Sequence, residues 1–464
     1  MSLFDVVKLQ RDRFSMACDR EGRRVGGKIA QTYWPPGAGG GQTEVRLLQI
    51  TDVLFAPGAG AFFYDDQAAI RAGAIHDGFS YSGAPITPGY TSVRMPATSL
   101  GIGLVLSDQS VVWGDMMSVQ YSGSAGRAPL FQIDQITEIA RAALLPRLIG
   151  HDPSEFLTSC NSVFAPFEGK RLPLAIEYGA SQALLGAAAH IGRRTMAEVI
   201  CNEFRLPTPR AGVPIYAQSG DSREINVDKM ILKAVDILPH GLINAPDKFG
   251  RNGEVFREFV RWVAKRIKEL GSPGYHPTLH FDVYGWIGLE FGLNPTGIAE
   301  FIARVADDVP DFTLNIECPA DYGSVGAQVR GYTGIVTAMA RLGASARIVA
   351  DEHCNTLDDI LLFARAKAAH LVQIKTPDVG SIADTARAVL ACKENGVGAY
   401  VGGSCVETDL SARTSVHVSV ATQAEMMLAK PGMGVDEALC IVGNEQSRLL
   451  AVLASRPKPD NGPK

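Results

Sequence analysis

The C-terminal half of the chain alternates short apolar runs with longer stretches of helical spacing. Eight runs have the length of buried strands: residues 214–217, 234–238, 278–283, 313–316, 346–350, 371–374, 398–401 and 426–429. Helix candidates between them cover residues 253–269, 297–305, 357–368, 382–396 and 411–421. Buried strands that are each followed by a helix predict a parallel α/β barrel over residues 206–452. An open doubly wound sheet is the alternative, but no GxGxxG motif follows the first run.

The preceding part of the chain has a different order of elements. Strand-like stretches cover residues 45–55, 99–106 and 110–120, and the last two form a predicted hairpin around Asp108-Gln109. Helical spacing recurs from Ile133 to Leu145, and one long helix is predicted over residues 180–204. Strands followed by helices predict an α+β domain over residues 45–205. Residues 1–44 end in a Pro/Gly-rich linker, and residues 453–464 are expected to form a mobile tail.

The composition narrows the class of protein. Charged residues make up 20% of the 464 residues and the net charge is −5, which argues against a strongly basic nucleic-acid binder. No apolar run approaches the roughly 20 residues that a membrane-spanning helix needs. Asp5, Lys8 and Arg11 lie where a secretory signal has its apolar core, and the cysteines form no CxxC pair. The sequence therefore predicts an enzyme of the reducing cytoplasm.

Polar residues close seven of the eight predicted barrel strands. The C-terminal ends of the strands form the active-site face of such a barrel, so these side chains are expected to meet. In chain order they are Gln218, His240, Asp282, Glu317, Asp351, Lys375, and the pair Ser404 and Cys405. The sequence therefore predicts one polar site at the mouth of the barrel.

Asp282, Glu317 and Asp351 end three successive strands. Carboxylate oxygens from neighbouring strands suit a hard divalent cation, and Mg²⁺ also keeps coordination positions open for a substrate. Without a cation, the same arrangement brings three like charges together at a cost in free energy. The alternative is that these are ordinary loop carboxylates, but their succession on three strands favours a Mg²⁺ site.

Lys375 and His240 are the candidate bases. Gln373 and Lys375 alternate with Val372 and Ile374, so both are predicted to point into the mouth of the barrel. A lysine near a metal loses its proton more readily when it is partly buried; a surface lysine is the alternative. His240 is either a second base or a structural histidine.

Other candidate nucleophiles and bases are assigned to the scaffold. His280 and His353 lie near strand ends but are placed off the inward face, so both are expected to be structural. Cys405 is expected to form part of a pocket wall. A metal and a base together favour removal of a proton from the carbon next to a carboxylate, because the cation stabilises the charge that develops.

Several motifs resemble one family in more detail. The segments DVYG (282–285), VADE (349–352), VQIKTPD (372–378) and LAKPGMG (428–434) are similar to those of the methylaspartate ammonia-lyases of the enolase superfamily. So are HDGF (76–79), VQYSG (119–123), QSGD (218–221), NVDKM (226–230), LPH (238–240) and GGSC (402–405). The resemblance covers residues 45–452. It implies an enolase-type TIM-like (β/α) barrel with an N-terminal α+β capping domain, in a cytoplasmic homodimer.

The resemblance also implies a reaction and its residues. The family deaminates (2S,3S)-3-methylaspartate, a small dicarboxylate amino acid, to mesaconate and ammonia through a metal-stabilised aci-carboxylate, with Mg²⁺ and a monovalent cation such as K⁺. Asp282, Glu317 and Asp351 would bind Mg²⁺. Lys375 would remove the C3 proton, and His240 would serve the (2S,3R) epimer. The residues implied to contact the substrate are Gln218, Gln373, Ser404, Cys405, Gln120, Tyr400 and Leu428.

The chain departs from the family pattern at a few positions. Ser404 stands where the family usually has threonine, Cys318 replaces a glycine and Ala128 replaces an aspartate, while residues 1–44 have no recognised counterpart. These changes bear on substrate preference rather than on the chemistry. The alternatives are another enolase-superfamily lyase, racemase or dehydratase on a related small acid, and an inactive barrel that binds a partner. The intact set of acidic and basic residues argues against the last.

Overall fold

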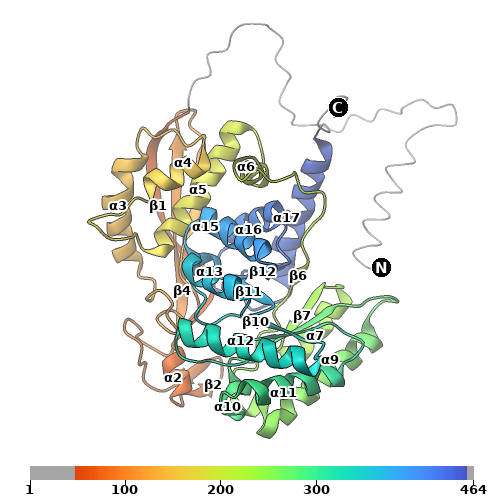
Figure 1. Cartoon of the computed structure of the whole chain (residues 1–464). Helices are drawn as coiled ribbons and strands as arrows, with labels where there is room; N and C mark the ends of the chain where they lie inside the picture. Colours follow the sequence, from red (N-terminus) through yellow and green to blue (C-terminus); the bar gives the residue numbers. More distant parts are fainter. Residues whose placement is uncertain (1–47, 457–464) are drawn as a thin grey trace, which may run out of the picture.

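The computed structural model describes residues 48–456, so the predicted linker in residues 1–44 and most of the predicted tail lie outside the described residues. Figure 1 shows a barrel surrounded by helices, with an antiparallel sheet and its own helices packed along one side. The predicted fold class, a barrel preceded by an α+β unit, is confirmed.

The barrel closes from eight parallel strands in the order β10-β11-β12-β13-β6-β7-β8-β9. Their bounds are β6 Ile215–Tyr216, β7 Ile237–His240, β8 Thr278–Asp282, β9 Leu314–Glu317, β10 Arg347–Ala350, β11 Leu371–Ile374, β12 Gly398–Val401 and β13 Met426–Leu428. Each strand coincides with a predicted run, except that the second run begins three residues too early. Ala234 has a φ of 52° and its amide bonds to Ile231 O, so it ends the preceding helix.

A long helix follows each barrel strand and covers the outside of the barrel (Figure 1). These helices are α7 Arg223–Leu232, α9 Glu254–Leu270, α11 Pro295–Asp308, α12 Val325–Leu342, α13 Leu357–Ala366, α15 Ile382–Glu394, α16 Asp409–Thr422 and α17 Asp436–Ser455. The five predicted helices are confirmed as α9, α11, α13, α15 and α16, while α7, α12 and α17 were not predicted. Of these, α12 is the longest that lies between two predicted strands. The glycines of α12 lower its helix propensity, but it buries Tyr332, Ile335 and Met339, and this packing stabilises it.

The barrel has two hydrophobic cores because alternate side chains of each strand point inward and outward. The larger core lies between the strands and the helices. The inner one fills the barrel with Tyr216, Ile237, Val349, Leu371, Tyr400, Met426 and Leu428. The barrel is therefore a packed support for side chains at its mouth rather than a pore.

The N-terminal sheet has the order β1-β4-β5, from β1 (Ile50–Asp65), β4 (Arg94–Leu106) and β5 (Val111–Met116). The predicted hairpin is confirmed as β4–β5. The predicted strand 45–55 was too short, since β1 continues to Asp65. Its Gly60 has no room for a Cβ beside the carbonyl of Val406, so a glycine within this strand marks a close contact with the barrel.

Helices complete the N-terminal unit. They are α2 Gln67–Arg71, α3 Ile133–Leu148, α4 Phe156–Val163, α5 Leu174–Gly192 and α6 Met196–Glu203, beside a small ribbon of β2 (Ile75–Asp77) and β3 (Ser80–Ser82). The single helix predicted over residues 180–204 is wrong. Arg193 ends α5 in the left-handed conformation, and a capping box between Thr195 and Glu198 starts α6.

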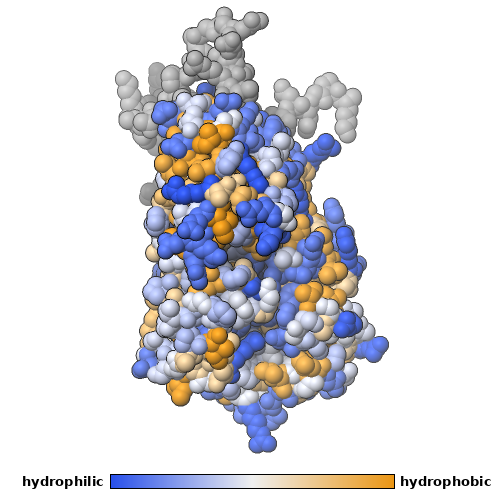
Figure 2. All heavy atoms as spheres, turned by 90° about the vertical axis from the view of Figure 1, so that its left-hand side faces the viewer, coloured by the Kyte–Doolittle hydropathy of each residue, from blue (hydrophilic) through white to orange (hydrophobic). Residues whose placement is uncertain are grey.

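Helix α5 joins the sheet to the barrel. Gln182 bonds to the backbone of Asp115 on β5, and Ser181 accepts the amide of Ile382 at the start of α15 at 2.9 Å. Figure 2 shows the face of the molecule that lies on the left in Figure 1. Hydrophobic side chains form separate patches among hydrophilic ones on this face. Within residues 48–456, no helix has the length and apolar character needed to cross a membrane.

Candidate active site

The C-terminal ends of the barrel strands surround a cavity of about 60 Å³. The structure brings most of the predicted site residues together on its wall: Gln120, Gln218, His240, Asp282, Glu317, Asp351, Gln373, Lys375, Ser404 and Cys405. All but Gln120 come from the barrel; Gln120 belongs to the loop after β5. The side chains at the ends of the seven strands therefore line one cavity, as the sequence predicts.

Asp282, Glu317 and Asp351 form a compact acidic triad on the neighbouring strands β8, β9 and β10. One oxygen of each lies within 4.8 Å of the others, and all three side chains are buried. Burial raises the pKa of Asp282 and raises that of Glu317 well above its ordinary range, and the neighbouring carboxylates add to both shifts. A divalent cation relieves this repulsion, and a set of oxygen donors alone fits Mg²⁺.

The two candidate bases face each other across the cavity. His240 ends β7 and Lys375 follows β11, and these strands are four positions apart in a barrel of eight. The strands of the triad lie between them on one side. A small molecule bound against the triad therefore has one basic side chain on each flank.

Lys375 is tied to the triad. Its Nζ forms an ion pair with Asp351 Oδ1 and donates to Asp351 O at 3.1 Å. Burial acts to lower the pKa of Lys375, but the negative charge of Asp351 outweighs it and the pKa is raised. The sequence led us to expect a lowered pKa. The difference arises because the ammonium lies directly against the carboxylate of Asp351.

His240 is held in one tautomer. The amide of Leu242 donates to Nδ1 at 3.3 Å, so Nε2 carries the proton of the neutral ring. Nε2 lies 3.5 Å from Asp282 Oδ2. The ring therefore presents Nε2 toward the triad.

The remaining wall carries uncharged polar groups. Gln218 Oε1 and Gln373 Oε1 are buried and have no hydrogen-bond partner among the residues that the structure describes. Ser404 Oγ accepts the amide of Gln120 at 2.9 Å, and Cys405 Sγ donates to Gln120 Oε1 at 3.1 Å. Buried polar atoms without partners are uncommon in folded proteins, so the two glutamines indicate a place for a polar ligand.

Tyr400 and Leu428 differ from the other residues for which a substrate contact was predicted. Both belong to the inner core of the barrel and neither lines the cavity. Tyr400 packs edge-to-face on Tyr216, with ring centroids 5.5 Å apart. In this structure they support the cavity from within the barrel.

The placement of His280 off the inward face was wrong. His280 and Asp282 are two residues apart on β8 and so share the inward face. His280 Nε2 lies 2.6 Å from Glu317 Oε2, and its ring stacks on Tyr216. Burial lowers the pKa of His280 well below its ordinary value, so the ring is neutral. Nδ1 faces the side-chain NH₂ of Asn315, so Nε2 carries the hydrogen and donates a hydrogen bond to Glu317. His353, by contrast, pairs with Asp321 at 3.0 Å and lies off the cavity wall.

Sequence analysis assigned no role to Arg127 and Glu352, which also line the cavity. Arg127 Nη2 lies 2.5 Å from Glu352 Oε2 and 3.8 Å from Asp351 Oδ2. Glu352 follows a predicted metal ligand directly, which was an available signal. Its partner is 225 residues away in the N-terminal unit, and no local pattern reveals such a pair.

Comparisons with known proteins agree with this geometry. Family models for the N-terminus and the C-terminus of methylaspartate ammonia-lyase match residues 48–205 and 208–455. Methylaspartate ammonia-lyase 1 of Carboxydothermus hydrogenoformans is 47% identical over 88% of this chain and 97% of its own length.

Solved structures give the same result. The crystal structure of the Citrobacter amalonaticus methylaspartate ammonia-lyase containing (2S,3S)-3-methylaspartic acid has a TM-score of 0.86 and 47% identity, and covers 88% of this chain and 100% of that one. The Mg complex of the Clostridium tetanomorphum β-methylaspartase has a TM-score of 0.84 and 43% identity, with 88% and 100% covered. A muconate lactonizing enzyme from Pseudomonas fluorescens, 17% identical with a TM-score of 0.56, shares the fold over 81% of this chain and 85% of its own.

The barrel, the sheet packed beside it and the acidic triad at the strand ends define the class of protein, a parallel α/β-barrel protein with an acidic site at the mouth of the barrel. The chain belongs to the methylaspartate ammonia-lyase family. It is a carbon–nitrogen lyase.

Proposed function

We propose that this protein converts (2S,3S)-3-methylaspartate to mesaconate and ammonia in a Mg²⁺-dependent reaction. The observation that carries the proposal is the buried triad of Asp282, Glu317 and Asp351 in contact with Lys375 at the wall of one cavity. The relative from Citrobacter amalonaticus, at 47% identity, was solved with this substrate. A small dicarboxylate amino acid is therefore the expected ligand.

The triad would hold Mg²⁺. The relative from Clostridium tetanomorphum was solved as a Mg complex, which supports this choice of metal. When bound, the cation supplies positive charge that stabilises the negative charge developing on a substrate carboxylate. A monovalent cation such as K⁺ is part of the proposal only through the family resemblance.

Lys375 would act as the base toward C3. It takes the C3 proton, the C–H electron pair forms the C2=C3 double bond, and the C2–N bond breaks with its electrons going to the departing ammonia. Burial favours the neutral amine, so Lys375 gains base character once the charge of Asp351 is engaged by another cation. The ion pair between Lys375 and Asp351 therefore supports the role of Lys375 as the base.

His240 would serve the (2S,3R) epimer. It flanks the cavity on the side opposite to Lys375, and its Nε2 faces inward. To accept the C3 proton there, the ring would take the tautomer with its proton on Nδ1, in place of the one that accepts the Leu242 amide. A proton on the other face of C3 lies on that side. Two bases on opposite strands therefore give the site access to both configurations at C3.

The uncharged polar groups would orient the substrate. Gln218 and Gln373 offer amide groups whose oxygens lack partners within residues 48–456, and an amine or ammonium donates to such oxygens. Ser404, Cys405 and Gln120 lie together on the same wall and would contact a carboxylate. Neutral groups orient a dianion without competing with the triad for a metal.

The proposal is tested by incubating the purified protein with (2S,3S)-3-methylaspartate and following the ultraviolet absorbance of the conjugated product. We expect formation of mesaconate with Mg²⁺, loss of activity with EDTA, and recovery when Mg²⁺ is added in excess. An unchanged rate in EDTA would contradict metal dependence. Absence of product under all conditions would contradict the assignment of substrate. Cytoplasmic location and a homodimeric state stay predictions.

A further inference from the structure

A buried ion pair lies beside the cavity without lining it. Lys430 follows β13 and Glu407 follows β12, and their side chains are 1% and 0% exposed. Lys430 Nζ lies 3.0 and 2.9 Å from the two carboxylate oxygens of Glu407. Burial of two charges costs free energy, and the cost is offset only where the other donors and acceptors of the pair are also satisfied.

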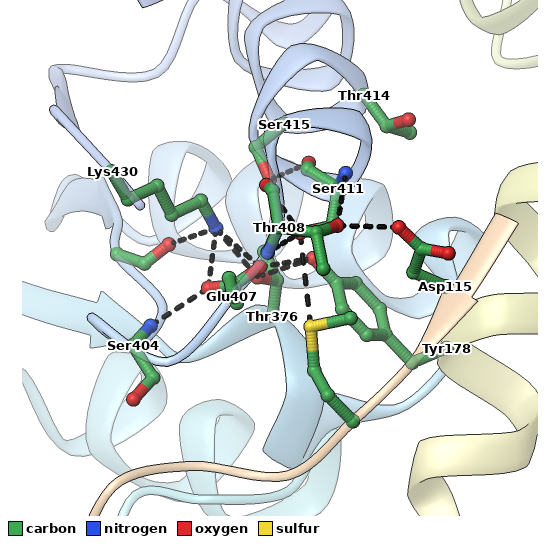
Figure 3. A network of polar contacts seen from close by, with 12 residues as sticks. Asp115, Tyr178, Thr376, Ser404, Glu407, Thr408, Ser411, Thr414, Ser415 and Lys430 are labelled. Atoms are coloured by element: carbon green, nitrogen blue, oxygen red, sulfur yellow. Dashed lines mark hydrogen bonds and ion pairs between the residues drawn. The ribbon is translucent and has the colours of Figure 1, made fainter. Parts of the chain in front are cut away.

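The pair has partners for its remaining hydrogen-bonding groups. Lys430 Nζ donates to Gly402 O and to Thr376 Oγ1, both at 2.9 Å. Glu407 Oε2 accepts the amide of Ser404 at 2.7 Å, and Oε1 accepts the hydroxyl of Tyr178 from α5. Figure 3 shows Lys430 and Tyr178 approaching Glu407 from opposite sides, with Ser404 below Lys430. A network without spare donors or acceptors is rigid.

The network determines the shape of one segment, residues 402–407, which we name the binding loop. Gly402 and Ser404 are bonded to the ion pair through their backbone. Gly403 has a φ of 149°, and a Cβ there would clash with Glu407 Oε2 and Lys430 Nζ. The loop therefore follows the contour of the buried pair. Gly403, Ser404 and Cys405 form part of the cavity wall.

We propose that Lys430 and Glu407 are positioning residues that fix the binding loop and thereby set substrate affinity without touching the substrate. The inference rests on the proposed function, in which Ser404 and Cys405 contact the substrate. Lys375 has supports of its own, because it pairs with Asp351 and its carbonyl accepts the amides of Asp378 and Val379, both at 3.0 Å. Loosening of the loop should therefore raise KM more than it lowers kcat.

The test uses the double variant Glu407→Gln/Lys430→Met, which removes both charges and leaves neither one buried alone. We expect KM for 3-methylaspartate to rise about tenfold or more while kcat changes by less than about threefold. We expect faster hydrogen exchange at the Ser404 amide, because its charged acceptor is lost. Affinity for Mg²⁺, measured by calorimetry, should stay unchanged, since the pair does not touch the triad.

The matched control is Asp308→Asn, which breaks the partly buried ion pair of Asp308 with Arg257 between two outer helices. It should leave KM and the Ser404 amide unchanged. A folded double variant with wild-type KM, or with wild-type protection of that amide, overturns the positioning role. A wild-type protein that does not turn over 3-methylaspartate overturns the proposed function instead, and the exchange rate of the Ser404 amide then still decides whether the pair fixes the loop.

Discussion

Two polar clusters lie next to each other at the mouth of the barrel, and they differ in how their groups are paired. Around the cavity, three carboxylates share one space and the oxygens of Gln218 and Gln373 lack partners among the described residues. Beside the cavity, Lys430 and Glu407 pair with each other and form further hydrogen bonds to Thr376, to Tyr178 and to the backbone of the binding loop. Both clusters are almost inaccessible to solvent.

The comparison teaches that crowded like charges and oxygens without partners, rather than burial, distinguish the reacting groups from the supporting ones. Unpaired polar atoms and crowded like charges cost free energy, so they are retained where a ligand or a metal will satisfy them. A fully paired cluster has nothing left to offer a ligand and gives its neighbours a fixed position instead. The same residue type, glutamate, occurs in both clusters with opposite consequences.

The largest expected effect tests whether the cluster around the cavity carries the reaction. Lys375→Ala should lower kcat for the (2S,3S) isomer by roughly a thousandfold or more, within the range that a general base contributes. His240→Ala should lower mainly the turnover of the (2S,3R) isomer. Rates are measured separately with each isomer at saturating Mg²⁺. An equal loss with both isomers in both variants would refute the assignment of two bases.

The next effect sharpens the comparison by making one chemical change in both clusters. Glu407→Gln leaves the charge of Lys430 buried without a counter-charge and should cost about 3–5 kcal/mol of unfolding free energy. Glu317→Gln removes one of three crowded charges and should raise the stability of the metal-free protein, because burial and its neighbours raise the pKa of Glu317. Urea unfolding in EDTA measures both changes. A loss of stability in both variants would show that the clusters do not differ.

The smallest effect concerns Asp378, a buried carboxyl near the cavity. Burial raises the pKa of Asp378 to about 6, against the opposing effects of Arg127 and Lys375. The folded protein therefore holds this proton more tightly than the unfolded chain, and its contribution to stability falls as pH rises from about 4 to about 6. Asp378→Asn should stabilise the protein above this window by at most about 3 kcal/mol, and not below it. Urea midpoints at pH 4 and pH 7.5 test this, and a gain of equal size at both pH values would contradict it.

The barrel could be predicted from the sequence because its signals are local. Apolar runs of strand length mark each strand, and the residue after each run is placed at the mouth by the topology alone. Asp282, Glu317 and Asp351 were found in this way. Motif resemblance added Gln120, which lies far from the barrel in the chain and gives no such signal by itself.

The remaining features depend on contacts between distant segments. The pair of Arg127 with Glu352 and the hydroxyl of Tyr178 on Glu407 join residues more than 200 positions apart. The break between α5 and α6 depends on a left-handed residue that is not a glycine, which hydrophobic spacing does not reveal. The position of His280, by contrast, is encoded locally: it lies two residues before Asp282 in β8, and alternation of side chains along a strand puts both on the inward face.

His280 links Glu317, at the C-terminal ends of the strands, to residues at the other end of the barrel through a chain of hydrogen bonds. His280 Nδ1 lies 3.4 Å from the amide nitrogen of Asn315, whose oxygen accepts Arg347 Nε at 3.0 Å, and Arg347 pairs with Glu425 at the start of the strands. Arginine has only donors, so it fixes the orientation of the Asn315 amide and, through it, the proton on His280. A substitution of Arg347, at the N-terminal ends of the strands, would therefore alter the hydrogen bond that Glu317 accepts, although Arg347 does not contact Glu317.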